Sequence, residues 1–266
     1  MKKLLVAALC ASATGVIAQS MNYYVTDGTS GPGNTHVLSA GTVQFSYAWA
    51  ADAQMAIVLG DFGSGVRVRQ AASQPGSGSP QQGDEYLLDG TPTGFTNTWV
   101  SPDPAGTTAY DAGFDGSSIY MVHWLGQTDG QVFRYDNNYA NGQFLFQAAI
   151  GDLGITYDNA SGTIWTSNFG TGAVTNYDLS GNVLSQFQSG SGAAALAYEV
   201  SSDTLWLSET SAGLIAQYSK TGTLLDSYTA PAYVLGGEFA MIPEPATVFA
   251  IGAGLLALCI RRRIGR

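Results

Sequence analysis

The sequence predicts an all-β protein, and three observations support this prediction. Gly, Ser, Thr, Asn and Tyr are abundant while Lys occurs only three times, a composition that favours strands and turns over helices. No stretch between the two ends of the chain shows the periodicity of an amphipathic helix. Residues 154–187 align without a gap with residues 195–228, at an offset of 41. A repeat of about 40 residues that contains four short strands is typical of one blade of a β-propeller.

The first 18 residues are typical of a secretory signal peptide. Lys2 and Lys3 precede an apolar stretch over residues 4–13. Val16-Ile17-Ala18 then places small or tolerated residues before a cut after Ala18, as signal peptidase requires. We therefore predict that the chain is exported and that residues 1–18 are removed.

Residues 19–242 form the predicted propeller domain, a length that is sufficient for one well-buried core. This segment holds 19 carboxylates and only four basic residues, a net charge of −15. Such a surface repels nucleic acid and anionic lipid headgroups, so nucleic acid is not an expected partner. Both cysteines, Cys10 and Cys259, lie outside this segment, which excludes disulfides and thiol catalysis within it.

The two ends of the domain are predicted to share one blade. Tyr23–Asp27 and Thr35–Leu38 look like the middle strands of a blade that lacks its first strand. Gly237–Met241, at the other end of the domain, looks like a lone first strand because it parallels Ala195–Tyr198. Pairing of these segments closes the ring and removes an open sheet edge.

Two looser copies of the repeat lie upstream of the clear ones. In the first copy, over residues 43–89, Gln44–Tyr47 is the predicted first strand, and Gly60–Val66 parallels Ser167–Ala173. Residues 70–107 are rich in Pro, Gly and Ser, and they predict long loops on one face. Four internal units and the shared blade make about five blades, with six as the alternative.

The clearest repeat predicts its own four strands. They are Gly154–Asp158, Thr163–Asn168, Ala173–Asp178 and Val183–Gln188. Gly and Asn occupy the turns between them, where they tolerate a positive φ. Aromatic residues recur at matching positions of both repeats, and we expect them to pack in the core or between blades: Trp165, Trp206, Tyr157, Tyr198, Tyr177 and Tyr218.

The second strand of the repeat carries a recognisable pattern, Ile164-Trp165-Thr166-Ser167-Asn168, which is followed by a glycine turn. An apolar or aromatic residue, a small residue, Asp or Asn and then a Gly turn resemble the repeats of NHL-type and gluconolactonase-type propellers. The resemblance covers most of the domain. It implies a fold more than an activity, because unrelated functions share this fold.

One repeat position carries a polar side chain in every unit. The residues predicted to end the second strand of each unit are Asp27, Asp61, His123, Asn168 and Glu209. Equivalent positions in a propeller lie at similar radius and height, so these side chains are candidates to ring one face and to bind Ca²⁺ or another divalent cation. The gluconolactonase-type resemblance likewise implies a metal held by acidic and Asn side chains near the channel. Asp and Asn at a strand end before a glycine turn favour the other interpretation, in which these side chains accept backbone hydrogen bonds in Asx-turns.

The remaining candidate sites are sparse, and no catalytic residue is assigned. His36 and His123 are the only histidines, so only these two residues could serve as the base of a Ser-His-Asp triad. Asp103, Asp111 and Asp115 are spaced like loop carboxylates without an EF-hand pattern, and the last two are candidates for paired acids. Three tryptophans off the repeat positions are candidates for stacking on sugars: Trp49, Trp99 and Trp124.

The C-terminal segment 243–266 has three parts in a fixed order. Pro243, Glu244 and Pro245 precede an uncharged run over residues 246–260. A helix of this run spans roughly 22 Å, which is short for a transmembrane helix. Flanking arginines can snorkel to the membrane interface. The arginines that follow the run are Arg261, Arg262, Arg263 and Arg266.

This order of box, apolar run and arginine cluster resembles the PEP-CTERM sorting signal of Gram-negative bacteria. The resemblance implies that the chain is a substrate of an exosortase, a membrane-bound transpeptidase. The positive-inside rule places the arginine cluster in the cytoplasm and the propeller outside the inner membrane. An ordinary tail anchor is the alternative.

Three functions remain open at this point. The first is an exported binding or structural module at the cell surface or in the extracellular polysaccharide, with the Sec translocon and exosortase as partners. The second is a metal-dependent lactonase, hydrolase or lyase on the same scaffold. The third is a sugar- or protein-binding receptor that uses the loops over residues 70–107.

Overall fold

The computed structural model describes residues 21–28, 31–51, 53–72, 81–99, 108–124, 130–190 and 192–240, all within the compact unit Met21–Met241. The predicted signal peptide and the predicted helix over residues 246–260 lie outside the described residues. Within the described part of the chain, no helix combines the length and the apolar character that a membrane crossing needs.

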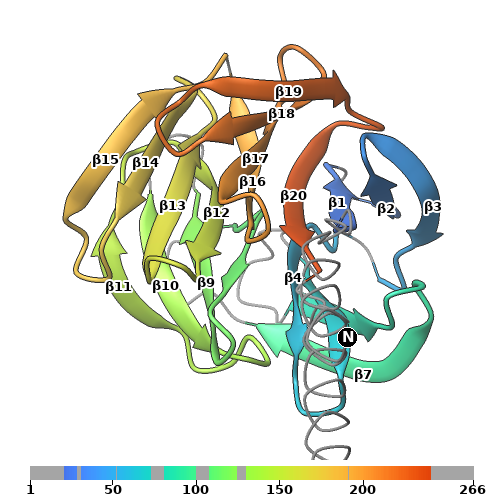
Figure 1. Ribbon diagram of the computed structural model, residues 1–266. Helices are drawn as coiled ribbons and strands as arrows, with labels where there is room; N and C mark the ends of the chain where they lie inside the picture. The colour runs from blue at the N-terminus through green and yellow to red at the C-terminus, as the bar shows by residue number, and fades with distance from the viewer. Residues whose placement is uncertain are drawn as a thin grey trace, which may run out of the picture. The chain divides into compact units, whose positions relative to one another are not determined.

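The described chain forms five four-stranded antiparallel sheets that surround a common axis, which confirms the predicted five-bladed propeller (Figure 1). The closing blade contains β20 (Val234–Phe239), β1 (Tyr23–Asp27), β2 (Asn34–Ser39) and β3 (Thr42–Ala48), from the axis outward. The second blade contains β4 (Ala56–Asp61), β5 (Val66–Ala71), β6 (Gln81–Tyr86) and β7 (Pro92–Trp99). The third contains β8 (Gly113–Phe114), β9 (Ser118–His123), β10 (Gln131–Asp136) and β11 (Gln143–Gln147).

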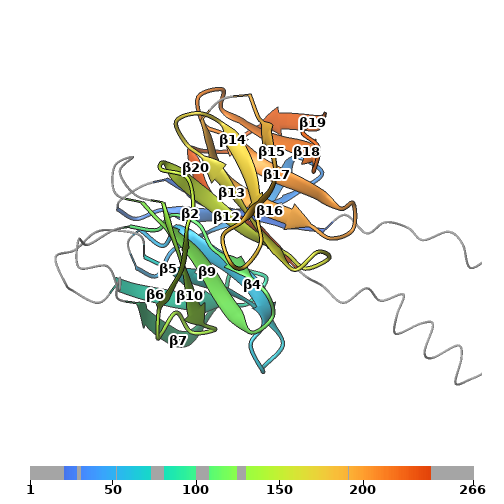
Figure 2. The same cartoon turned by 90° about the vertical axis from the view of Figure 1, so that its left-hand side faces the viewer.

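The fourth and fifth blades are the two clear repeats. The fourth contains β12 (Asp152–Asp158), β13 (Thr163–Asn168), β14 (Ala173–Tyr177) and β15 (Val183–Gln188). The fifth contains β16 (Ala193–Glu199), β17 (Thr204–Glu209), β18 (Leu214–Ser219) and β19 (Leu224–Thr229). In the side view of Figure 2, these two blades lie above the second and third blades. Their strands agree with the predicted ones to within two residues at each end.

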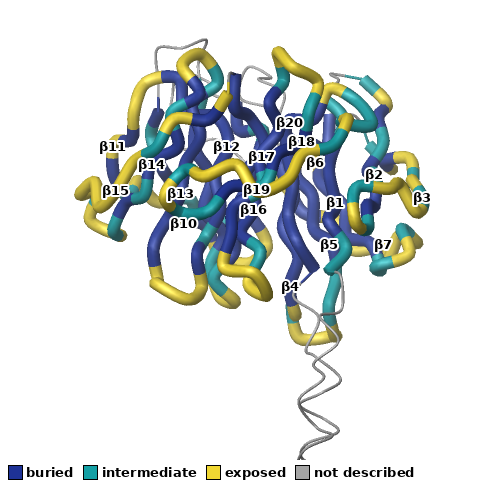
Figure 3. The backbone as a smooth tube through the Cα atoms, turned by 45° about the horizontal axis from the view of Figure 1, so that its top comes forward, coloured by how far each residue is buried: buried dark blue, intermediate teal, exposed yellow. Residues whose placement is uncertain are grey.

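Burial follows the distance from the axis. The first strands of the blades, such as β16 and β20, are almost entirely buried, whereas the outermost strands β15 and β19 are mostly exposed (Figure 3). Apolar side chains on both faces of each blade therefore form the core between neighbouring blades. This arrangement explains why the inner strands are buried on both faces while the outermost strands face solvent.

The closing blade confirms the predicted sharing between the two ends of the domain. β20 pairs with β1 in antiparallel register, with Tyr23 opposite Phe239 and Val25 opposite Gly237. The rings of Tyr23 and Phe239 stack with centroids 4.6 Å apart. The last described strand and the first described strand therefore hold the ring together.

Two sequence predictions for the upstream blades are wrong. Gln44–Tyr47 lies in β3, the outermost strand of the closing blade, and does not begin the second blade. The 70–107 segment contains the strands β6 and β7 instead of only loops, although residues 73–80 and 100–107 lie outside the described part. The Pro-, Gly- and Ser-rich composition of the 70–107 segment favoured loops, although Gly83 lies in β6 against the backbone of Gln70. The first-strand prediction for Gln44–Tyr47 depended only on its likeness to the inner-strand sequences of other blades.

A repeated contact joins neighbouring blades. An aromatic side chain of one outer strand packs under the glycine turn between the third and fourth strands of the next blade. The contacts are Tyr47 with Gly90, Phe146 with Gly181, Phe187 with Gly222, and Tyr228 with Gly41. The four glycines have φ between +75° and +85°. The absence of a side chain therefore allows the positive φ of the turn and also leaves room for the aromatic ring that packs against it.

We expect Gly181→Ala to destabilise the propeller by about 2–4 kcal/mol. A Cβ at this position would lie 2.6 Å from the Cβ of Phe146, in addition to the strain of φ +85°. The matched control is Gly94→Ala, because Gly94 has φ +82° with nothing within 4 Å of an added Cβ. That variant should lose only about 1–2 kcal/mol from backbone strain. Urea unfolding measures both losses, and equal losses would contradict the proposed aromatic–glycine contact.

Candidate functional site

The predicted polar ring is not formed by equivalent residues. Asp27, His123, Asn168 and Glu209 end β1, β9, β13 and β17, which are the second strands of their blades. Asp61 ends β4, a first strand, which runs antiparallel to the second strands. Asp61 therefore lies at the opposite end of its blade. The alignment misplaced it because the preceding segment belongs to the closing blade.

Two of the candidate ring residues, Asp61 and Asn168, accept hydrogen bonds from nearby backbone amides. Asp61 Oδ1 accepts the amides of Gly63 and Gly65, at 2.8 and 3.1 Å. Asn168 Oδ1 accepts the amides of Gly170 and Thr171, at 3.1 and 2.9 Å. These are the Asx-turn contacts that an Asp or Asn at a strand end before a glycine turn predicts. Among the residues that the structure describes, no group of three or more His, Cys, Asp or Glu side chains could hold a metal ion.

His123 and Glu209 bond to side chains of their own blades. His123 is fully buried, and its Nε2 lies 2.7 Å from the hydroxyl of Tyr135. Its ring stacks on Phe133 with centroids 4.2 Å apart. Glu209 Oε1 accepts bonds from the amide of Gly190 at 2.9 Å and from the hydroxyl of Tyr218 at 2.5 Å. His123 therefore belongs to the core of the third blade.

Glu209 also borders a small surface pocket of about 160 Å³ between the fifth blade and the closing blade. The loop after β17 forms one wall, and Tyr233 and Val234 form part of the other. Val234 pairs with Asp27 across β20 and β1. One lining residue of the pocket, Val234, is therefore the strand neighbour of Asp27.

The axis of the propeller is occupied by Asp111, which comes from the connection between the second and third blades. Its side chain is fully buried. Oδ2 accepts the amides of Ile155 and Leu196, at 3.1 and 2.8 Å, and Oδ1 accepts the amide of Gly237 at 3.0 Å. One carboxyl therefore joins β12, β16 and β20.

The repeat explains why three amides meet one carboxyl. Ile155, Leu196 and Gly237 are spaced 41 residues apart, so they are the same position in three consecutive units. Each lies on an innermost strand, whose inward-facing amides have no further strand to pair with. Asp111 supplies the acceptor that these buried amides require.

Burial is the main influence on the pKa of the two carboxyls at the axis, Asp111 and Glu238. Burial raises the pKa of the Asp111 carboxyl well above its usual range, although four backbone amides act in the other direction. Burial also raises the pKa of Glu238 on β20, and the neighbouring Asp111 adds to that increase. Glu238 accepts the amide of Phe239 at 2.8 Å and the hydroxyl of Thr156 at 3.4 Å. The two carboxyls thus belong to the packed interior.

The sequence does not predict the role of Asp111. Its spacing places it only among the loop carboxylates Asp103, Asp111 and Asp115, and makes it a candidate for paired acids with Asp115. Asp115 instead accepts the amides of Ser117 and Ser118, both at 2.7 Å, in the turn between β8 and β9. Asp103, the third carboxylate of that group, lies outside the described residues. No local pattern around Asp111 indicates its three partners, because they come from other blades.

Two of the tryptophans proposed for sugar stacking are buried, which corrects that interpretation. Trp49 donates its Nε1–H to the Thr35 hydroxyl at 3.0 Å, and Trp99 donates to the carbonyl of Ala72 at 2.6 Å. Both side chains are less than one-tenth exposed. Trp124 is half-buried and contacts the Tyr110 ring edge-on, with centroids 5.6 Å apart.

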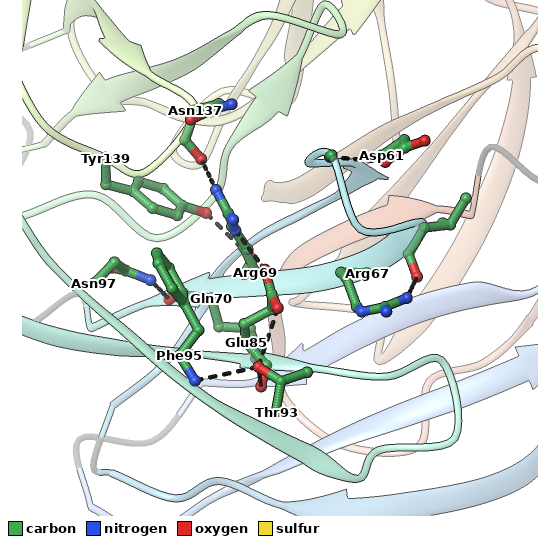
Figure 4. Close-up of polar contacts among 12 residues, drawn as sticks. Asp61, Arg67, Arg69, Gln70, Glu85, Thr93, Phe95, Asn97, Asn137 and Tyr139 are labelled. Carbon is green, nitrogen blue, oxygen red and sulfur yellow. Dashed lines mark hydrogen bonds and ion pairs between the residues drawn. The ribbon is translucent and has the colours of Figure 1, made fainter.

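A buried arginine joins the second and third blades, at the boundary without an aromatic–glycine contact. Arg69 Nε lies 2.8 Å from Glu85, and its Nη1 donates to the carbonyl of Asn137 at 2.6 Å (Figure 4). Its guanidinium lies over the ring of Phe62 at 4.0 Å and that of Phe95 at 4.5 Å. At this boundary, a guanidinium held between two aromatic rings and a carboxylate takes the place of the aromatic–glycine contact seen at the other four boundaries.

Lys220 makes the corresponding ionic contact between the fourth and fifth blades. Its Nζ lies 2.7 Å from Asp158 and also contacts Asp203. Burial alone would raise the pKa of Asp158, but the bonds from Lys220 and Ser161 hold it below its usual range. Two of the four basic residues of the domain are therefore used to join blades.

One polar cluster lies on the closing blade, away from the axis. Asp27 Oδ1 lies 2.9 Å from Nε2 of His36, and Nδ1 of His36 lies 2.7 Å from the hydroxyl of Ser46. Asp27 Oδ2 accepts the amide of Asn34 at 2.9 Å. The sequence singles out Asp27 and His36 separately, and no pattern in it connects either of them with Ser46.

Comparison with known families finds one match, the PEP-CTERM protein-sorting motif, at residues 242–263. The predicted sorting signal is therefore confirmed. Comparison with curated proteins finds no match.

Among solved structures, a chain of a nidogen/laminin complex superposes with a TM-score of 0.53 at 10% identity, covering 83% of this chain and 98% of that one. A streptogramin B lyase gives a TM-score of 0.46 at 13% identity, over 82% and 71%. Virginiamycin B lyase from Staphylococcus aureus gives 0.45 at 14% identity, over 80% and 71%. At these identities the first similarity indicates the fold alone, and the two lyases support no argument about activity.

Proposed function

We propose that this protein is an exported propeller of the bacterial envelope, processed by an exosortase, that acts at the cell surface or in the extracellular polysaccharide as a binding or structural module. The observation that carries the proposal is the position of the sorting motif. Ala240 is buried and its amide donates to the carbonyl of Asn22 at 3.2 Å. The motif begins two residues later, at Ile242.

This position lets the propeller survive processing. Cleavage in or after the Pro243–Pro245 box leaves β20 in place, so the ring stays closed. The axis is held by Asp111 and two blade boundaries by ion pairs. The product is a rigid, acidic, cysteine-free platform, which suits an oxidising extracellular location.

We expect replacement of Pro243, Glu244 and Pro245 by alanine to block processing without unfolding the propeller. In a Gram-negative host with an exosortase, the variant should keep its C-terminal segment and remain in the membrane fraction, while the wild type loses that segment. Pro231→Ala, a proline of the domain outside the motif, is the control and should be processed normally. Fractionation and immunoblotting measure both proteins. Normal processing of the triple variant would contradict the proposed role of the motif.

A further inference from the structure

Three chemically complementary side chains lie in a row across the outer strands of the closing blade. Asp27 is on β1, His36 on β2 and Ser46 on β3. His36 stands opposite Val25 on one side and opposite Ser46 on the other. Because side chains alternate between faces along a strand, all three project from the same face of the sheet. The carboxylate, the imidazole and the hydroxyl are thereby aligned.

The hydrogen bonds define the direction of proton transfer. Asp27 accepts from Nε2 of His36 at 2.9 Å, so the proton of a neutral imidazole resides on Nε2. The lone pair of Nδ1 then accepts the hydroxyl proton of Ser46 at 2.7 Å. These are the nucleophile–base and base–orienter contacts that activate a serine.

Asp27 is held in its charged form. Its Oδ2 accepts both the amide and the side-chain amide of Asn34, at 2.9 and 3.2 Å. Burial alone would raise the pKa of the Asp27 carboxyl, but the bonds from His36 and Asn34 outweigh burial and hold that pKa below its usual range. A charged Asp27 stabilises the imidazolium that forms when Ser46 loses its proton.

The hydroxyl of Ser46 is accessible. Ser46 is exposed on β3, the outermost strand of the blade. The amide of Trp49 donates inward to the carbonyl of Gly33, whereas the amide of Ala50 donates away from β2 to the Tyr86 hydroxyl. Amides alternate in direction along a strand, so the amide of Ser46 also points to the open edge. There it is available to a negatively charged oxygen beside the serine.

We propose that Asp27, His36 and Ser46 form a nucleophilic triad that hydrolyses carboxylic esters, an activity that goes beyond the proposed envelope role and does not depend on it. Ser46 Oγ attacks the ester carbonyl and its proton moves to Nδ1 of His36. The tetrahedral intermediate collapses, the C–O bond to the alcohol breaks, and the alcohol leaves with that proton. Water, deprotonated by His36, then cleaves the acyl-serine, which releases the carboxylic acid and restores Ser46.

The location of the triad selects the class of ester. Ser46 lies on an open sheet surface, so only the acyl group and its carbonyl need to contact the blade. The alcohol part remains in solvent and can be large. Short acyl esters carried on a polymer, such as O-acyl groups of a polysaccharide, therefore fit this site better than a small buried ester.

The test uses the full chain purified in detergent, with p-nitrophenyl acetate as substrate and a fluorophosphonate as serine-directed label. Ser46→Ala should lower the hydrolysis rate by about 100-fold or more and abolish labelling. Ser227→Ala is the matched control, because Ser227 occupies the equivalent outer-strand position of the fifth blade opposite Ala216. It should retain both the rate and the label. Because Ser46 is exposed, its alanine variant should melt like the wild type.

Asp27→Asn tests the positioning role of the carboxylate. This variant should lose hydrolysis mainly through kcat with little change in KM, since the imidazole is no longer held in the active tautomer. Peptide mapping of the label on Ser46 in the wild type supports the proposal. Labelling of other residues only, or wild-type hydrolysis by Ser46→Ala, overturns it. Neither result would affect the localisation experiment on the sorting motif.

Discussion

Replacing Asp111 by alanine is expected to lower the free energy of unfolding by about 3 kcal/mol or more. The substitution leaves the amides of Ile155, Leu196 and Gly237 without their acceptor at the axis. Each buried, unpaired polar group costs about 1–3 kcal/mol. Because a typical domain is stable by only about 5–15 kcal/mol, the loss is a large part of the total. Urea unfolding followed by tryptophan fluorescence measures it.

Two control variants are informative. One compares the loss of stability at the axis with that at an ordinary surface turn, and the other separates the effect of losing the hydrogen bonds from that of losing the charge. Asp115→Ala removes a carboxylate that accepts two local amides at a surface turn, and should cost about 1 kcal/mol. Asp111→Asn keeps one acceptor oxygen, so it should lose less than the alanine variant. Equal losses for Asp111→Ala and Asp115→Ala would contradict the role of Asp111.

The Asp111→Asn variant also tests how the Asp111 carboxyl makes the stability of the propeller depend on pH. A raised pKa in the folded state means that the Asp111 carboxyl binds its proton more tightly in the folded chain than in the unfolded chain. Its contribution to stability is therefore fully present below the unfolded pKa and is lost as pH rises through the folded pKa. Asp111→Asn removes this decline, so its stability relative to the wild type should improve as pH rises.

Removal of β20 is expected to unfold the propeller, whereas removal of the tail alone is not. A chain that ends at Pro243 keeps β20, but a chain that ends at Leu235 loses Gly236–Phe239. Phe239 is buried and stacks on Tyr23. Burial of such a side chain contributes about 1.5–3 kcal/mol. The same truncation removes the strand partner of β1 and one of the three amides at Asp111.

Thermal melting of the two truncated chains, followed by circular dichroism, measures the difference. The longer chain should melt at the same temperature as the full-length chain. The shorter chain should show no cooperative transition, because β1 and β16 are left beside an open gap. Equal melting temperatures for the two chains would contradict the closure of the ring by β20.

The parts of the fold that were predicted correctly depend on local patterns. The fourth and fifth blades were located because their residues recur at a spacing of 41, and the strands of each repeat are joined by short turns. The segment 237–241 was recognised as a closing strand because it parallels Ala195–Tyr198, the first strand of the fifth blade. Where the repeat is degraded, as in residues 43–107, the strands were assigned to the wrong blade, and Asp61 was misplaced with them.

The candidate sites depend on contacts between distant parts of the chain. Asp111 meets Gly237 across 126 residues, and its partners on three blades share no pattern with its own surroundings. His36 meets Ser46 only because β2 and β3 pair in one register, and a shift by one residue would place them on opposite faces. Composition and spacing contain no information about such a register.

The sequence alone therefore determined that this chain is a propeller of about five blades, closed by its two ends and followed by a sorting motif. These features follow from periodicity and from runs of residues that act locally. Only the tertiary structure decided that a carboxyl holds the axis and that Asp27, His36 and Ser46 align on the closing blade. The physical reason is that hydrogen bonds depend on distances and directions within a few tenths of an ångström, which only the packed blades establish.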